Sequence, residues 1–239
     1  MNDICNSLKN VNISEPFEDP DTSIINNICK NIIGSEIKIE YNITFQNGDI
    51  DNGIIDNCNI VGDCLENILF PYIKKTIKTL EEGPKQSFPD FWNRNRRYNW
   101  ELKTFNIKNG PGFDISNFIS YIGQLLDDNG VDNKLFKTKY LIFEYSLDNY
   151  IIKINKFKLC NVWEIINYDG KYPISLQNKK NTWYNIRPCT FNNMISKGKT
   201  PNLFIEKICE AILICPNKLE DRENKIINIK KQFNQLKND

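Results

Sequence analysis

Residues 87–105, SFPDFWNRNRRYNWELKTF, contain two segments rich in aromatic residues that are typical of β-strands. The polar stretch between them is predicted to form a hairpin loop, so Asp90 and Glu101 are expected near each other on paired strands. Lys103 follows Glu101 by two residues, and such residues point to the same face of an extended strand. The stretch therefore predicts a strand pair that carries two carboxylates and an ammonium group at one place.

Two carboxylates and an ammonium group can together serve phosphodiester hydrolysis. Asp90 and Glu101 supply the hard oxygen ligands that a divalent cation such as Mg²⁺ prefers. A bound cation lowers the pKa of its water and neutralises charge on a phosphate, while Lys103 orients the water or stabilises the transition state. The pattern indicates a metal-dependent nuclease. The structural alternative is that Asp90 caps a turn after Pro89, with Glu101 and Lys103 forming a solvated pair.

Further motifs follow at regular spacing, and together they suggest a family. They are Pro89-Asp90-Phe91, Glu101-Leu102-Lys103, Phe105-Asn106, Pro111-Gly112-Phe113-Asp114-Ile115, Tyr140-Leu141-Ile142-Phe143, Val162-Trp163-Glu164-Ile165 and Ile186-Arg187-Pro188. In these motifs, over roughly residues 60–191, the chain resembles type II restriction endonucleases of the NgoBV/NlaIV type. The resemblance implies an α/β fold with a PD-(D/E)XK core, in which helices flank a mixed central sheet.

The resemblance also implies an activity. It suggests a type II restriction endonuclease that hydrolyses double-stranded DNA with Mg²⁺ and leaves 5′-phosphate ends. Asp90 and Glu101 would hold the metal, and Lys103 would position the attacking water. The implied partners are a second copy of the chain, which would form a homodimer on a short palindromic site of the GGNNCC type, and a cognate DNA methyltransferase. A repair or recombination nuclease and a non-catalytic DNA-binding module are the alternatives.

Four other residues are candidates for the site. Glu66, on a predicted helix, would complete the outer shell of the metal or simply face solvent. Asp114 would assist metal or water positioning, or would start a helix as a favourable N-terminal acid. Asn106 is expected to contact DNA. Arg187 is the best candidate for reading a base, because arginine donates two hydrogen bonds to guanine, although a phosphate contact or a structural salt bridge would also explain it.

The net charge of +1 conceals an uneven distribution. Residues 1–70 contain twelve acidic and three basic residues, whereas residues 71–239 contain eighteen acidic and twenty-eight basic residues. Because basic side chains neutralise phosphates, the second part is expected to carry the DNA-binding face, although any single lysine can equally be a solvated surface residue. The basic candidates are Arg94, Arg96, Arg97, Lys134, Lys137, Lys139, Lys153, Lys156 and Lys158.

The absence of histidine excludes several kinds of chemistry. Ser-His-Asp hydrolysis and nucleases with a histidine base are ruled out, whereas a site of carboxylates and lysine needs no histidine. The eight cysteines form no Cys-x-x-Cys pair, so a zinc site is not predicted. Most cysteines are expected to be buried and reduced.

The length of 239 residues fits one nuclease domain, with an acidic N-terminal part (1–59), a catalytic core (60–191) and C-terminal helices (192–239). No apolar run is long enough to span a bilayer and no signal peptide begins the chain, so a cytoplasmic protein is expected. Hydrophobic patterning predicts strands and helices along the chain. The strands are expected at 36–45, 139–147 and 150–157, and the helices at 62–80 (kinked or split by Pro71), 114–126, 201–215 and 218–236.

Overall fold

The computed structural model describes residues 20–38, 40–44, 46–54, 58–83, 88–93, 98–125 and 135–235. Its helices are α2 (Pro20–Ile32), α3 (Cys58–Thr76), α4 (Phe118–Gln124), α5 (Val162–Ile165), α6 (Pro201–Ile214) and α7 (Arg222–Gln235), with a 3₁₀ turn, η2, at Phe191–Asn193. Its strands are β1 (Glu36–Lys38), β2 (Glu40–Thr44), β3 (Ile50–Ile54), β4 (Leu80–Glu82), β5 (Phe91–Asn93), β6 (Asn99–Asn106), β7 (Ser116–Asn117), β8 (Thr138–Asp148), β9 (Ile151–Cys160), β10 (Leu176–Lys179) and β11 (Thr182–Ile186).

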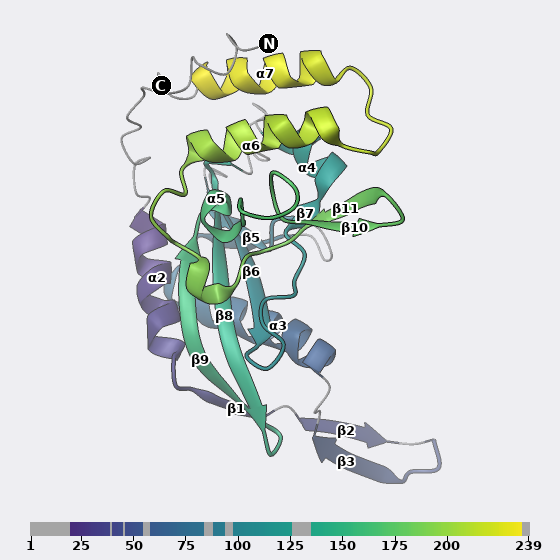
Figure 1. Cartoon of the computed structure of the whole chain (residues 1–239). Coiled ribbons are helices and arrows are strands. Elements are labelled where there is room, and N and C mark those ends of the chain that lie inside the picture. Colours follow the sequence, from purple (N-terminus) through teal and green to yellow (C-terminus); the bar gives the residue numbers. More distant parts are fainter. Residues whose placement is uncertain are drawn as a thin grey trace.

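A mixed sheet with the strand order β1-β9-β8-β6-β5-β4 forms the centre of the described part of the chain (Figure 1). β6 and β8 pair in parallel, and the segment that connects them contains β7 and α4. The other neighbours in this sheet are antiparallel. The expected α/β architecture with a mixed central sheet is therefore confirmed.

Each face of the sheet packs against its own hydrophobic cluster. Trp100, Leu102 and Phe143 face a cluster that includes buried residues of α2 and α3. Residues one position away, including Tyr140 and Ile142, belong to a second cluster with α4, α5, α6 and α7. This alternation follows the two-residue period of a strand, and it makes the central strands apolar on both sides. In Figure 1, α6 and α7 lie side by side at the end of the molecule opposite the β2–β3 hairpin.

Two of the expected helices differ from the observed ones, in three respects. α3 is not split at Pro71, because buried residues of the same apolar face, Leu69 and Ile73, lie on either side of the proline and their packing outweighs one lost backbone hydrogen bond. The helix ends at Thr76, and Leu80 begins β4 instead. The third difference concerns the helix predicted at 114–126.

That helix begins four residues later than expected, at Phe118. Asn117 Oδ1 accepts hydrogen bonds from the backbone N–H groups of Ile119 and Ser120, so Asn117 is the N-cap. Residues 116–117 instead pair with β11. The prediction that Asp114 starts the helix is therefore wrong.

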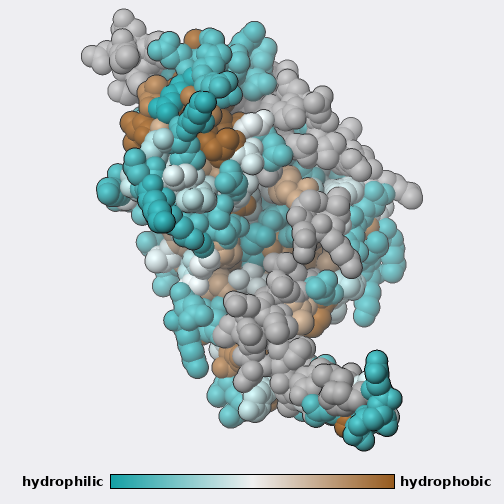
Figure 2. Space-filling view, turned by 90° about the vertical axis from the view of Figure 1, so that its right-hand side faces the viewer, coloured by the Kyte–Doolittle hydropathy of each residue, from teal (hydrophilic) through white to brown (hydrophobic). Residues whose placement is uncertain are grey.

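The single strand predicted at 36–45 is wrong, because this stretch forms two strands in different sheets: β1 pairs with β9, and β2 pairs with β3. The remaining predicted elements agree closely with the structure. The hairpin of β8 and β9 turns at Asn149 and Tyr150, whose positive φ angles of 46° and 64° suit the tight turn of a twisted hairpin. α6 and α7 lie where two closing helices are predicted. Figure 2 shows apolar atoms gathered at the level of these helices, and the exposed aliphatic side chains there include Leu213, Ile214 and Ile227.

Two general expectations can also be compared with the structure. The six cysteines among the described residues are free, and all except Cys64 are buried, as expected. Within the described part of the chain, no helix combines the length and the apolar character that crossing a membrane requires.

Candidate active site

The pairing of β5 with β6 brings the three main candidate residues together. Phe91 pairs with Trp100 in antiparallel register, so one further step places Asp90 opposite Glu101 on the same face. Asp90 Oδ2 accepts a hydrogen bond of 2.6 Å from the Leu102 backbone N–H. Lys103 Nζ lies 2.7 Å from Glu101 Oε1. The expected meeting of Glu101 and Lys103 on one face is thus observed.

The carboxylate–lysine cluster is largely buried rather than solvated. The Glu101 and Lys103 side chains are 10% and 17% exposed. Glu101 Oε2 is buried and has no hydrogen-bond partner among the described residues. A buried carboxylate oxygen without a partner is costly, and this cost is commonly accepted where an ion or a substrate completes the site. The alternative in which Glu101 and Lys103 form a solvent-exposed structural pair therefore does not describe these residues well.

Gly83 holds the segment that carries Asp90. The Gly83 N–H donates a hydrogen bond of 2.7 Å to the Asp90 carbonyl oxygen. A Cβ atom at position 83 would lie 1.7 Å from the Pro89 carbonyl oxygen, so a side chain cannot fit there. Sequence reasoning missed this role, since the only local signal is the Gly83-Pro84 dipeptide, which marks any turn or loop.

Burial and charge make Asp90 an unusual carboxylate. Its pKa is raised from 3.8 to about 6, chiefly by desolvation and also by the nearby Glu101 charge, while Lys103 and the Leu102 N–H partly offset these two effects. The ionised form of a carboxyl group is unfavourable when the group is buried beside another carboxylate, unless a bound cation compensates the charge. The folded, metal-free protein therefore holds a proton at Asp90 more tightly than the unfolded chain does.

Replacing Asp90 by asparagine is expected to stabilise the metal-free protein at pH 7.5. A pKa raised from 3.8 to about 6 corresponds to at most about 3 kcal/mol of unfolding free energy lost by the wild type above pH 6. The variant avoids this loss, so its unfolding midpoint should rise by several degrees. The difference should shrink as pH falls from about 6 towards 3.8, and it should vanish below 3.8, where the wild-type carboxyl is protonated in both states.

Thermal unfolding with EDTA over this pH range measures the effect. Asp169→Asn, which changes an exposed carboxylate, is the control. An Asp90→Asn midpoint equal to or below that of the wild type at pH 7.5 would contradict the assignment of Asp90 as a destabilised carboxylate.

The donor set fits a magnesium ion in type and number. Mg²⁺ usually takes one or two protein carboxylates and keeps waters and phosphate oxygens as its other ligands. Asp90 and Glu101 provide two carboxylates, and the second Glu101 oxygen is unpartnered among the described residues. Among the side chains that the structure describes, no group of three or more Cys, Asp or Glu residues could hold a metal ion.

The remaining candidate acids and arginines fall into two groups. Glu66 lies in α3, but its side chain is outside the described residues, as are Arg94, Arg96 and Arg97. Asp114 and Arg187 are brought together, with 3.0 Å between Asp114 Oδ1 and Arg187 Nε. The Arg187 guanidinium also donates a hydrogen bond to the Gly112 carbonyl oxygen. In this state Arg187 therefore holds the 112–114 segment, which matches the salt-bridge explanation of its presence.

Asn106 and several of the candidate lysines already make hydrogen bonds or ion pairs within the protein. Asn106, at the end of β6, is buried, and its Oδ1 accepts a hydrogen bond from the Lys108 N–H. Several lysines of the expected DNA-binding group have internal partners. Lys139 donates to Asn161 Oδ1, Lys158 donates to the carbonyl oxygens of Phe191 and Met194, and Lys156 lies 3.1 Å from buried Glu144.

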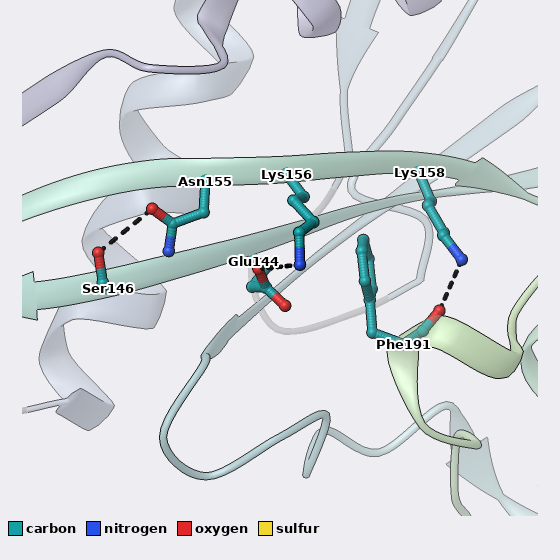
Figure 3. Close-up of polar contacts among 6 residues, drawn as sticks. All are labelled: Glu144, Ser146, Asn155, Lys156, Lys158 and Phe191. Atoms are coloured by element: carbon teal, nitrogen blue, oxygen red, sulfur yellow. Dashed lines mark hydrogen bonds and ion pairs between the residues drawn. The ribbon is translucent and has the colours of Figure 1, made fainter.

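Figure 3 shows how differently two of these lysines are placed. Lys158 bonds to the Phe191 carbonyl, and its Nζ lies 4.7 Å from the centre of the Phe191 ring. Lys156 reaches from β9 to Glu144 on β8, but its side chain stays 56% exposed. Of these two lysines, Lys156 is the better placed to meet a phosphate.

Comparison with known proteins gives concordant results. The family model described as NgoBV restriction endonuclease matches residues 22–238. The type II restriction enzyme NlaIV of Neisseria lactamica is 28% identical over 176 residues, which cover 71% of this chain and 70% of that enzyme. The solved structure of the NlaIV restriction endonuclease superposes with a TM-score of 0.73 at 24% identity, covering 89% of each chain. The expected PD-(D/E)XK fold is thereby confirmed.

Proposed function

We propose a specific reaction for this chain, which belongs to the NgoBV restriction endonuclease family and is a type II restriction endonuclease. In this proposal it cuts double-stranded DNA at a short palindromic site and requires Mg²⁺. The observation that supports the site most directly is the convergence of Asp90, Glu101 and Lys103 on one sheet face. The products are 5′-phosphate and 3′-hydroxyl ends. The resemblance to the NgoBV/NlaIV type suggests a GGNNCC-type sequence as the first to test.

Each residue of the site has a separate task. Asp90 and Glu101 would hold the Mg²⁺, which would supply activation of water as a nucleophile and neutralisation of charge on the phosphate. Lys103, in an ion pair with Glu101 Oε1, orients the attacking water and stabilises the negative charge that develops on the phosphoryl oxygens. Gly83 keeps the Asp90 backbone close to β4. Water attacks the phosphorus and the bond to the 3′ oxygen breaks, so the phosphate stays on the 5′ end.

DNA recognition requires further groups, which we assign as follows. Arg94, Arg96 and Arg97 contact the DNA, and Asn106 and Arg187 contact bases or phosphates. Arginine pairs with guanine through two hydrogen bonds, so Arg187 would have to exchange its contacts with Asp114 and Gly112 for such a role. Asp114 and Glu66 assist the positioning of the metal and its waters.

The assembly follows from the symmetry of the substrate. A palindromic site is read most simply by a two-fold symmetric homodimer in which each subunit cuts one strand. A cognate methyltransferase that modifies the same site protects the DNA of the host. Both activities belong in the cytoplasm, where the DNA is.

Digestion of methylation-free phage DNA tests the proposal. We expect purified protein with Mg²⁺ to produce discrete fragments, EDTA to prevent cleavage, and sequenced fragment ends to share one short palindrome. A smear of products would favour a repair or recombination nuclease. No cleavage, together with salt-sensitive DNA binding, would favour a non-catalytic binding module.

A further inference from the structure

One long segment of the chain, residues 170–205, contains basic residues but no acidic residue. The chain as a whole has 31 basic and 30 acidic residues, so this segment departs strongly from the average. Such an excess of positive charge is expected either on a solvated surface or where an anionic partner binds. The basic residues of the segment are Lys171, Lys179, Lys180, Arg187, Lys197 and Lys199.

The fold places two of these lysines at the tip of the β10–β11 hairpin. Lys179 pairs with Thr182, so Lys180 and Asn181 form the turn, and their φ angles of 49° and 59° are typical of a type I′ turn. The hairpin projects from the rest of the molecule, and residues 178–181 are exposed (Figure 1). Because this turn favours asparagine and glycine, its geometry gives no reason for a lysine at position 180.

The hairpin is firmly attached at its base. Trp183 is 2% exposed, and its ring packs against the rings of Phe118 and Tyr172. The Asn217 side chain accepts a hydrogen bond of 2.7 Å from the Trp183 N–H and donates one of 2.8 Å to the Trp183 carbonyl oxygen. An element that is already ordered loses little conformational entropy when it binds a partner.

The base of the hairpin lies on the same side of the central sheet as the active site. Ile186, in β11, belongs to the hydrophobic cluster that contains Tyr140 and Ile142. These two residues of β8 pair with Glu101 and Lys103 in the parallel register, and paired residues share a face of the sheet. The hairpin is therefore on the side to which the site residues project.

The tip lysines differ from Lys156 and Lys158, which already have partners on β8 and η2. Lys179 and Lys180 are exposed, and neither forms an ion pair with a carboxylate among the described residues. Lys179 Nζ lies 5.9 Å from the centre of the ring of Tyr184, which is itself 42% exposed. Such ammonium groups can bind a phosphate without giving up an internal ion pair.

We propose that the β10–β11 hairpin is a DNA-binding arm, whose tip lysines Lys179 and Lys180 contact backbone phosphates of the duplex. This inference rests on the proposed function, because it takes double-stranded DNA as the substrate, and it adds an element outside the carboxylate–lysine cluster. β11 leads directly into Arg187, which is assigned to DNA above. The arm and its base would therefore follow the same duplex.

The experiment compares two pairs of lysines in the full-length protein. Lys179→Gln/Lys180→Gln removes the two tip charges, and Lys75→Gln/Lys78→Gln is the matched control. Lys75 and Lys78 are also exposed, but they lie at the end of α3, which packs on the other face of the sheet. Affinity for a DNA duplex is measured with EDTA over a series of salt concentrations, and kcat and KM are measured with Mg²⁺.

The hairpin variant should bind DNA more weakly and with a smaller dependence on salt. The slope of log K against log salt concentration should fall by about two, or about one for each lost phosphate contact, and binding at about 0.1 M salt should weaken about tenfold or more. KM should rise while kcat stays unchanged, because the arm does not touch the reacting atoms. The control should match the wild type in every quantity.

Three results would overturn the proposal. They are a wild-type slope in the hairpin variant, equal losses in the two lysine pairs, and a loss of self-association with no change in DNA binding. The last result would mean that the tip binds the acidic part of a second copy instead. If the double variant fails to fold, Lys180→Asn, which suits the positive φ angle, should lower the slope by about one. If the wild type binds DNA without cutting it, the proposed function fails while the binding comparison still decides the role of the arm.

Discussion

Glu101→Gln is expected to lower the single-turnover rate of DNA cleavage by about 10³-fold or more, which corresponds to about 4 kcal/mol of transition-state stabilisation. The amide keeps the shape of the side chain but removes the negative charge that binds the cation and pairs with Lys103 at 2.7 Å. DNA binding without metal should persist, since removal of an acidic group does not weaken contacts to phosphates.

The control for this variant is a glutamate–lysine pair elsewhere. Glu210 lies 2.8 Å from Lys207 on α6, and it is 41% exposed. Glu210→Gln should cut DNA at the wild-type rate, because an exposed pair contributes little. Cleavage by Glu101→Gln within tenfold of the wild type would refute the assignment of Glu101 as a metal ligand.

Gly83→Ala is expected to reduce kcat about 10²-fold although the residue carries no functional group. The new Cβ would overlap the Pro89 carbonyl oxygen at 1.7 Å, so the backbone that carries Asp90 must move. A displacement of about 1 Å at a catalytic group can cost about 10²-fold in rate. The measurement is the single-turnover rate at saturating Mg²⁺, together with the unfolding midpoint.

Gly123→Ala is the matched control for this prediction. Gly123 lies in α4, where a Cβ would meet nothing within 4 Å, and alanine favours a helix over glycine. This variant should keep full activity and at least the wild-type stability. A Gly83→Ala protein as active as Gly123→Ala would show that the Gly83 contact does not position Asp90.

Local patterns in the sequence predicted much of this molecule. Alternation and apolar spacing located β8, β9, α6 and α7, because burial on one face of an element repeats with the period of that element. The two-residue spacing of Glu101 and Lys103 predicted their contact for the same reason. The absence of histidine and the motifs around Asp90 pointed to the family that residues 22–238 match.

Contacts between distant segments required the tertiary structure. Only strand register places Asp90 opposite Glu101 and Tyr140 next to it, and a parallel pair such as β6 and β8 joins segments separated by a long connection. The approach of Gly83 to the Pro89 backbone leaves no periodic trace in the sequence, since it depends on two backbones meeting rather than on a buried face.

Contacts between distant segments also decide which of the candidate side chains already have partners within the protein. Residue type and charge distribution predicted Arg187 and the lysines as DNA contacts, whereas in the folded protein Arg187 pairs with the Asp114 carboxylate and Lys158 donates to two carbonyl oxygens. The sequence by itself determined the chemistry available to this protein, namely carboxylates, lysines and no imidazole. The tertiary structure decided which of these groups meet, because their distances depend on pairing and packing between segments that are far apart in the chain.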